Sequence, residues 1–151
     1  MAKFKVELPT QLMRELETLN KNVPKMMEEM TEAGAEVVYN NVKTNMKSSF
    51  KDSSKLEKYL KVTKTYRTKD GSVNTKVGFY GYHKKGSKSF SVTSKKGETY
   101  SYDGVPVPLI VRAREFGSSS GEAKKPFFRK SFNKSQIESE MLKVQKKYIK
   151  E

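Results

Sequence analysis

The sequence predicts an α+β fold, in which helices at both ends of the chain pack on one antiparallel sheet of three or four strands. Apolar residues recur at helical spacing in residues 10–47 and again from Ile137 onward, whereas apolar and polar residues alternate in residues 60–79. The length of 151 residues suits one compact domain, so we expect a single domain over residues 1–151.

The N-terminal third predicts a short helix followed by a long one. Four apolar residues recur at spacings of four, three and four along the first helix: Leu12, Leu16, Leu19 and Val23. This helix should span about residues 10–21. Because proline is well tolerated in the first turn of a helix, Pro24 should open the second helix, with Asn22 as its cap. A methionine-rich apolar stripe extends that helix to about residue 47, and its helical spacing favours core packing over an adaptable binding face.

The middle of the chain predicts two β-hairpins. In the first, apolar residues alternate in residues 60–66 and 73–79 on either side of Asp70-Gly71, a turn signal because glycine adopts positive φ. In the second, residues 90–92 pair with residues 100–102 around Lys95-Lys96-Gly97. This hairpin lies in a lysine- and tyrosine-rich stretch, residues 82–104, which we expect to protrude as an insert.

Residues 105–117 can form a short helix or a strand. The prolines at the start of this stretch and Gly117 at its end favour the helix. A small polar loop follows in residues 118–125. Pro126 should then begin an extended segment that leads into a C-terminal helix from Ile137 onward.

The composition excludes several kinds of site and leaves the core small. There is no cysteine or tryptophan and only one histidine, so the sequence predicts no disulfide, structural metal or cofactor. No apolar run is long enough for a membrane span, and the N-terminus lacks the apolar core of a signal peptide, so we expect assembly in the cytoplasm. Hydrophobic residues make up 34% of the chain, which is consistent with further burial by neighbouring subunits.

The formal net charge of +14 would attract phosphate, anionic lipid or an acidic protein surface. One interpretation is a basic nucleic-acid-binding module, in which lysines of the insert contact phosphates and its aromatic residues stack on bases. These lysines are Lys84, Lys85, Lys88, Lys95 and Lys96. Lysine outnumbers arginine 26 to five, and no motif for reading base edges is present, so solubility explains the excess charge equally well. A membrane-surface role is disfavoured, because the basic residues do not gather on one helix opposite an apolar face.

The sequence offers little support for an enzyme. The strongest alternative of this kind is a small basic ribonuclease, in which His83 would act as general acid or base. Its phosphate would be held by Tyr80, Tyr82, Arg112 or Arg114. His83 falls in a predicted loop among lysines, where a histidine is usually only solvated. No convergent pair of carboxylates and no glycine-rich phosphate loop can be placed in the sequence. We therefore predict no catalytic residue.

Two short motifs near the C-terminus resemble those of a known family. Glu115-Phe116-Gly117-Ser118-Ser119 precedes a Gly/Ser-rich loop, and Pro126-Phe127-Phe128-Arg129-Lys130-Ser131-Phe132 follows it. This ordered combination is similar to that of the phage tail-component family typified by gene product ten of a lambdoid siphophage. The resemblance extends weakly over nearly the whole chain, through the two helices and the hairpin step Val77-Gly78-Phe79. The chain departs from the family at Lys130-Ser131, where Pro-Ala is usual, and in the insert.

The resemblance implies a structural virion protein of a phage or prophage, located at the head–tail joint or the tail end. Such a subunit would assemble as a ring, commonly sixfold, between the connector and the tail tube. Its partners would be further copies of itself, connector or adaptor proteins, and tail-tube or terminator proteins, with only transient DNA contact. No catalytic or cofactor-binding residue comes with the resemblance.

We call Glu115, Phe116, Gly117, Pro126, Phe127, Phe128 and Arg129 the assembly signature. Gly117 can end a helix or strand with positive φ, Pro126 fixes φ, and each phenylalanine contributes ~1.5–3 kcal/mol if fully buried. Glu115 could pair with Arg112, Arg114 or Arg129, within one subunit or across a ring seam. The alternative is a set of ordinary core phenylalanines and a surface ion pair that contributes only ~0–1 kcal/mol.

Overall fold

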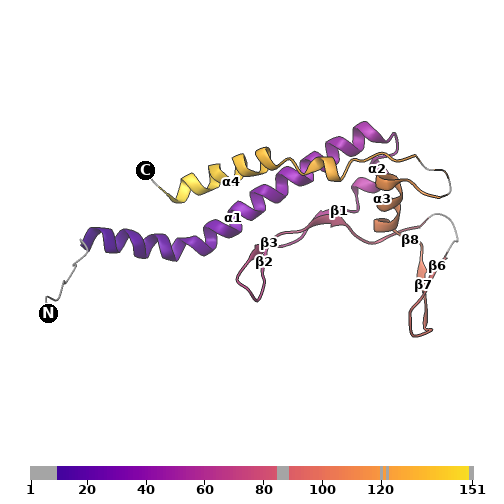
Figure 1. The fold of residues 1–151 in the computed structure, drawn as a ribbon, viewed down its shortest axis with the longest axis horizontal. Coiled ribbons are helices and arrows are strands. Elements are labelled where there is room, and N and C mark those ends of the chain that lie inside the picture. The colour runs from indigo at the N-terminus through magenta and orange to yellow at the C-terminus, as the bar shows by residue number, and fades with distance from the viewer. Residues whose placement is uncertain (1–9, 85–88, 120, 122, 150–151) are drawn as a thin grey trace, which may run out of the picture.

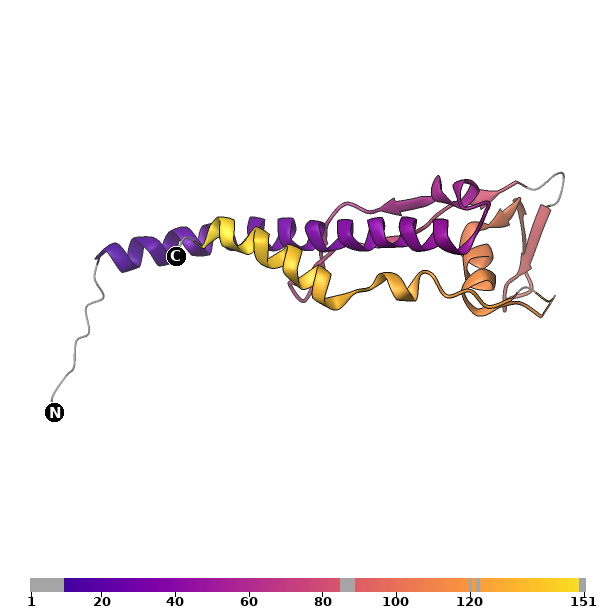
Figure 2. The ribbon, with the colours of Figure 1, turned by 90° about the horizontal axis from the view of Figure 1, so that it is seen from above.

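The computed structural model describes residues 10–84, 89–119, 121 and 123–149. Figure 1 shows an elongated molecule in which helix α1 (Thr10–Ser49) runs along most of the length and α4 (Lys134–Tyr148) lies beside it. One long β-hairpin follows α1, and a second hairpin and helix α3 (Val107–Phe116) lie at the end where α1 terminates (Figures 1 and 2). The predicted α+β class is confirmed.

Helix α1 is continuous, so the predicted break at residues 22–24 is wrong. Pro24 lies inside the helix, where the missing N–H and the ring cost ~3 kcal/mol. Good helix formers on both sides keep the other turns helical. Figure 1 shows α1 changing direction in its N-terminal half, where Pro24 lies. Pro24 therefore lies within one helix and does not open a second one.

The first hairpin consists of two antiparallel ladders separated by a short interruption. Its strands are β1 (Leu60–Val62), which pairs with β4 (Val77–Phe79), and β2 (Tyr66–Arg67), which pairs with β3 (Val73–Asn74). Between the ladders, the hydroxyls of Thr65 and Thr75 lie 2.8 Å apart. The predicted turn at Asp70-Gly71 is confirmed, with Gly71 at φ +84°.

The second hairpin also contains two antiparallel ladders. Its strands are β5 (Tyr82–His83), which pairs with β8 (Val105–Pro106), and β6 (Ser89–Thr93), which pairs with β7 (Thr99–Asp103). The predicted hairpin with its turn at Lys95-Lys96-Gly97 is confirmed, and in it Phe90 lies opposite Tyr102 and Val92 lies opposite Tyr100. His83 lies in β5, so the predicted loop at this residue is wrong.

Within the described residues, the strands form four two-stranded ladders where one sheet of three or four strands was expected. The hairpins follow one another along the chain, and one hydrogen bond extends the base of each: Tyr80 N–H to the Tyr59 carbonyl in the first, and Val107 N–H to the Gly81 carbonyl in the second. Alternation in a sequence predicts which side of a strand is buried, but not which of its edges finds a partner. The sequence therefore predicted the hairpins, but it did not predict that their strands would remain in separate two-stranded ladders.

The C-terminal half settles the choice left open for residues 105–117. Two residues form β8, and the helix α3 follows at once. Helix α2 (Ser54–Glu57) lies within a stretch for which the sequence predicted no helix or strand, and a short 3-10 helix, η1 (Arg129–Ser131), precedes α4. Helix α4 starts before Ile137, because the Asn133 side chain caps it by accepting a hydrogen bond from the Gln136 N–H.

The hydrophobic core lies where the C-terminal half of α1, the strands β1 and β4, and α3 meet. Its buried residues are Val38, Val42, Met46, Leu56, Leu60, Phe79, Val107 and Phe127. All core residues that α1 contributes lie in its C-terminal half. The N-terminal half of α1 thus extends away from the core, which is as small as the composition indicated.

Candidate assembly surface

The assembly signature is organised around one buried carboxylate. Glu115, near the end of α3, is only 3% exposed. Its Oε2 accepts hydrogen bonds from the backbone N–H groups of Phe127 and Phe128 at 2.8 and 2.9 Å, and its Oε1 accepts from the Arg129 N–H at 3.3 Å. Arg129 Nε also donates to Oε1, at 3.0 Å. Glu115 therefore joins α3 to the segment that leads into η1.

The hydrogen bonds keep this carboxylate ionised. Burial alone would raise the pKa of Glu115, but the N–H groups of Phe128 and Phe127, together with Arg129, outweigh burial and hold the pKa below its ordinary value. Of the three arginines predicted as partners, Arg129 pairs with Glu115 within the subunit. Arg114 instead donates two hydrogen bonds to Asp52, at 3.0 and 2.9 Å.

Phe127 anchors the signature in the core. It is fully buried, and its ring contacts Phe50 and Phe79 edge-on, with centroid distances of 5.2 and 6.2 Å. Ser131 Oγ donates to the Phe127 carbonyl at 2.7 Å, and Asn45 Nδ2 donates to Ser131 Oγ at 2.9 Å. Sequence reasoning missed Asn45 and Ser131. The departure from the family pattern at Lys130-Ser131 was a signal for Ser131, whereas Asn45 gave none.

Another part of the signature lies at the surface. Phe116 is 56% exposed, and the guanidinium of Arg129 lies 4.7 Å from the centre of its ring. Gly117 ends α3 with φ +82°, as predicted. The core interpretation of the signature therefore holds for Phe127, whereas Phe116 and Arg129 are accessible to another molecule.

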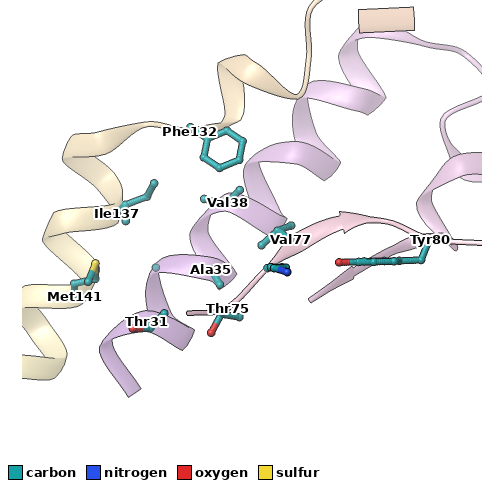
Figure 3. A pocket seen from close by; sticks show the side chains of 11 residues that line it. Thr31, Ala35, Val38, Thr75, Val77, Tyr80, Phe132, Ile137 and Met141 are labelled. Carbon is teal, nitrogen blue, oxygen red and sulfur yellow. The ribbon is translucent and has the colours of Figure 1, made fainter. Parts of the chain in front are cut away.

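An apolar groove lies between α1, α4 and the first hairpin, as Figure 3 shows. Its walls are formed by Ala35 and Val38 of α1, Ile137 and Met141 of α4, Val77 of β4, and Phe132 just before α4. The groove has a volume of 520 Å³, and Phe132 on its wall is 53% exposed. It brings together segments far apart in the sequence, and no motif pointed to it.

The lysines predicted to contact nucleic acid do not form one cluster among the described residues. Lys84 pairs with Asp103. Lys95 and Lys96 lie exposed at the turn between β6 and β7. The remaining two, Lys85 and Lys88, lie outside the described residues. Near the base of the hairpin, the rings of Tyr82 and Tyr102 stack with their centres 5.1 Å apart.

Neither a metal site nor a membrane span is found in the part of the chain that the structure describes. No group of three or more His, Cys, Asp or Glu side chains among the described residues could hold a metal ion. None of the helices in the described part of the chain is both long enough and apolar enough to cross a membrane.

A family model described as "Bacteriophage HK97-gp10, putative tail-component" matches residues 10–102. The chain belongs to this family of phage tail components. Comparison with curated proteins and with solved structures found no match. The resemblance recognised in the sequence is thus confirmed, and this tail component is a virion protein.

The matched residues cover α1, the first hairpin and most of the second, and they end before α3. Family membership therefore rests on the long helix and the hairpins. The assembly signature at residues 115–129 lies beyond the match. The evidence that the assembly signature of this tail component has a structural role is therefore the set of hydrogen bonds around Glu115, and not the family match.

Proposed function

We propose that this tail component works at the head–tail joint or the tail end, where its copies assemble as a ring between the connector and the tail tube. The observation that carries the proposal is the apolar groove, which leaves Phe132 and Tyr80 exposed in the single subunit. Contiguous exposed apolar surface commonly binds another protein. A subunit with a small core also gains burial by assembling.

The elongated shape supports a subunit with several separate contact surfaces. The β6–β7 hairpin extends away from α1 and α4, and the groove lies beside those helices (Figures 1 and 3). Such a subunit can hold a neighbour in its own ring through one surface and an adjoining ring through another. We assign the second kind of contact to connector or adaptor proteins on one side and to tail-tube or terminator proteins on the other.

The contacts of the described residues do not favour the ribonuclease alternative. The ring of His83 packs edge-on against Tyr59 at 6.1 Å, and Arg114 is bonded to Asp52. A general acid and a phosphate-binding arginine would need to converge on one accessible point. A structural role without catalysis is therefore the better interpretation.

Nucleic-acid binding is the second candidate function, and one observation favours it. Tyr100 is 49% exposed on the hairpin whose turn carries Lys95 and Lys96. Exposed aromatic rings beside lysines can stack on bases while the lysines contact phosphates. A ring at the joint lies beside the passing genome, so weak contacts of this kind suit it, whereas tight binding would hinder passage.

The test is the mass of the full chain, measured by light scattering over a wide range of protein concentration, at low and moderate salt. Parallel samples contain fluorescent single-stranded or duplex DNA, or phage tails assembled without this protein. Discrete oligomers, in solution or on tails, with at most weak and salt-sensitive DNA binding, are expected. A monomer that does not bind tails but binds DNA tightly at physiological salt would instead establish the nucleic-acid-binding function.

A further inference from the structure

The N-terminal end of α1 extends past the end of α4 in both views (Figures 1 and 2). We call residues 10–23 the arm. Its sequence places leucine or valine at spacings of four, three and four: Leu12, Leu16, Leu19 and Val23. Positions with this spacing lie along one side of a helix. Among the described elements, none lies beside the first turns of the arm (Figures 1 and 2).

A helix of this kind gains stability chiefly by packing its apolar side against something else. Helices that bind other proteins commonly do so by placing apolar anchors, spaced by three and four residues, into an apolar groove. The sequence of the arm has leucine and valine at this spacing, and Figure 3 shows an apolar groove of the kind that such residues bind. Lys76 is the one charged residue among those that line the groove, so apolar side chains suit it better than a charged ligand.

The arm cannot occupy the groove of its own subunit. Thr31, Ala35 and Val38, which line the groove, belong to the same continuous helix as the arm. A helix would have to fold back on itself to bring its first turns to this surface. Figure 1 shows α1 changing direction in its N-terminal half, but the helix does not reverse. An arm can therefore reach this groove only from a second copy of the chain.

The distribution of charge agrees with a second copy as the partner. The arm carries Arg14, Lys21, Glu15 and Glu17, so its net charge is zero, while the whole chain carries +14. Like-charged subunits repel each other least where a contact brings no further positive charge. The arm is thus a segment by which this basic protein can bind itself.

We propose that the arm of one subunit binds in the groove of the next copy. Arm and groove are different surfaces, so the contact is heterologous and repeats from head to tail, and such contacts close into rings when the rotation between neighbours allows. This inference rests on the proposed ring assembly and names its interface. Pro24, directly after the arm, would set the angle at which the arm leaves its own subunit.

Two variants of the full chain test the contact. Leu16→Glu places a charge on the arm, and Phe132→Glu places one at the groove, where the wild-type side chain is already exposed and folding should survive. Leu142→Glu, on an exposed part of α4 outside the groove, is the control. Light scattering should show rings for the wild type and the control, and monomers for either variant alone. An equimolar mixture of the two variants should give dimers and no rings, because it retains one intact arm and one intact groove per pair.

Other outcomes separate this inference from the proposed function. If rings persist in Leu16→Glu or in Phe132→Glu, or if the mixture stays monomeric, the arm–groove contact is wrong while ring assembly stands. If the wild type never self-associates, alone or on tails, ring assembly itself is wrong and the inference fails with it. Circular dichroism of each variant shows whether lost assembly reflects lost folding.

Cross-linking gives a second test, because the natural chain has no cysteine. Phe132→Cys is combined in turn with cysteine at Leu12, Leu16 or Leu19, and a short thiol cross-linker is added to the folded protein. At least one pair should give a ladder of covalent oligomers. The same arm cysteines combined with Leu142→Cys should not. A ladder of equal yield in the control pairs, or none from any groove pair, would overturn the proposal.

Discussion

Replacing Glu115 removes the acceptor that holds the segment after Pro126 against α3. In Glu115→Ala, the backbone N–H groups of Phe127, Phe128 and Arg129 lose their shared partner in a region of low exposure. In Glu115→Gln, the shape and one carbonyl oxygen are kept, but the charge is lost and the new amide group faces backbone donors. The two variants therefore separate loss of charge from loss of every hydrogen bond.

The expected costs follow from the burial of each donor. A buried donor left without an acceptor costs ~1–3 kcal/mol, and the Phe127 N–H is buried while the other two are partly buried. Glu115→Ala should therefore lower the free energy of unfolding by about 3–5 kcal/mol, and Glu115→Gln by about 2–3 kcal/mol. Arg129→Ala removes one bond from a side chain that is 55% exposed, together with the contact on Phe116, and should cost about 0.5–1.5 kcal/mol.

The assay is urea unfolding followed by circular dichroism, since the chain has no tryptophan to report by fluorescence. Arg129→Ala is the matched control, because it alters the same cluster from its exposed side. The expected order of destabilisation is Glu115→Ala, then Glu115→Gln, then Arg129→Ala. If Arg129→Ala costs as much as Glu115→Ala, the exposed ion pair holds the cluster together and the backbone donors of Phe127 and Phe128 do not.

Three further predictions concern stability. Because the pKa of Glu115 is lowered in the folded protein, the stability that the carboxylate contributes is complete above the ordinary value of 4.5 and is lost as pH falls through the lower folded value. The difference in free energy of unfolding between wild type and Glu115→Gln should therefore shrink below about pH 4.5. A difference that stays constant with pH would contradict this prediction. In thermal melting, Phe127→Ala should lower the stability of the fold by about 3–5 kcal/mol and Lys95→Ala by less than about 0.5 kcal/mol. Equal melting temperatures for the two variants would contradict the assignment of Phe127 to the core. Gly34→Val should cost about 1–3 kcal/mol in urea, because a Cβ at Gly34 would lie 3.2 Å from Ile137 Cγ2, and an unchanged midpoint would show that α4 can move away.

The parts of the fold that were predicted correctly depend on short stretches of chain. The turn at Asp70-Gly71 requires a glycine with positive φ, and the pairing of Phe90 with Tyr102 follows once the next turn is placed. Helix α3 was favoured by the prolines at its start and by Gly117 after it. These signals are local, so they can be read without knowing how the chain folds back on itself.

The parts that could not be predicted depend on contacts between distant segments. Glu115 was recognised as part of a motif, but its partners are mainly backbone N–H groups, which every residue except proline carries. Asn45 gave no signal, since it contacts Ser131 only after α1 and η1 have come together. The groove draws its lining from α1, α4 and the first hairpin, and no stretch of sequence contains it.

The error at Pro24 matters most for the interpretation of function. Two separate helices joined at residues 22–24 could have folded against each other, and the arm could then have covered the groove of its own subunit. Because α1 continues through Pro24, the arm extends past α4 and the groove stays open in the single subunit. In the proposed arm–groove contact, one continuous helix keeps the arm of a subunit away from that subunit's own groove, and this is the property that a subunit needs in order to assemble from head to tail with copies of itself.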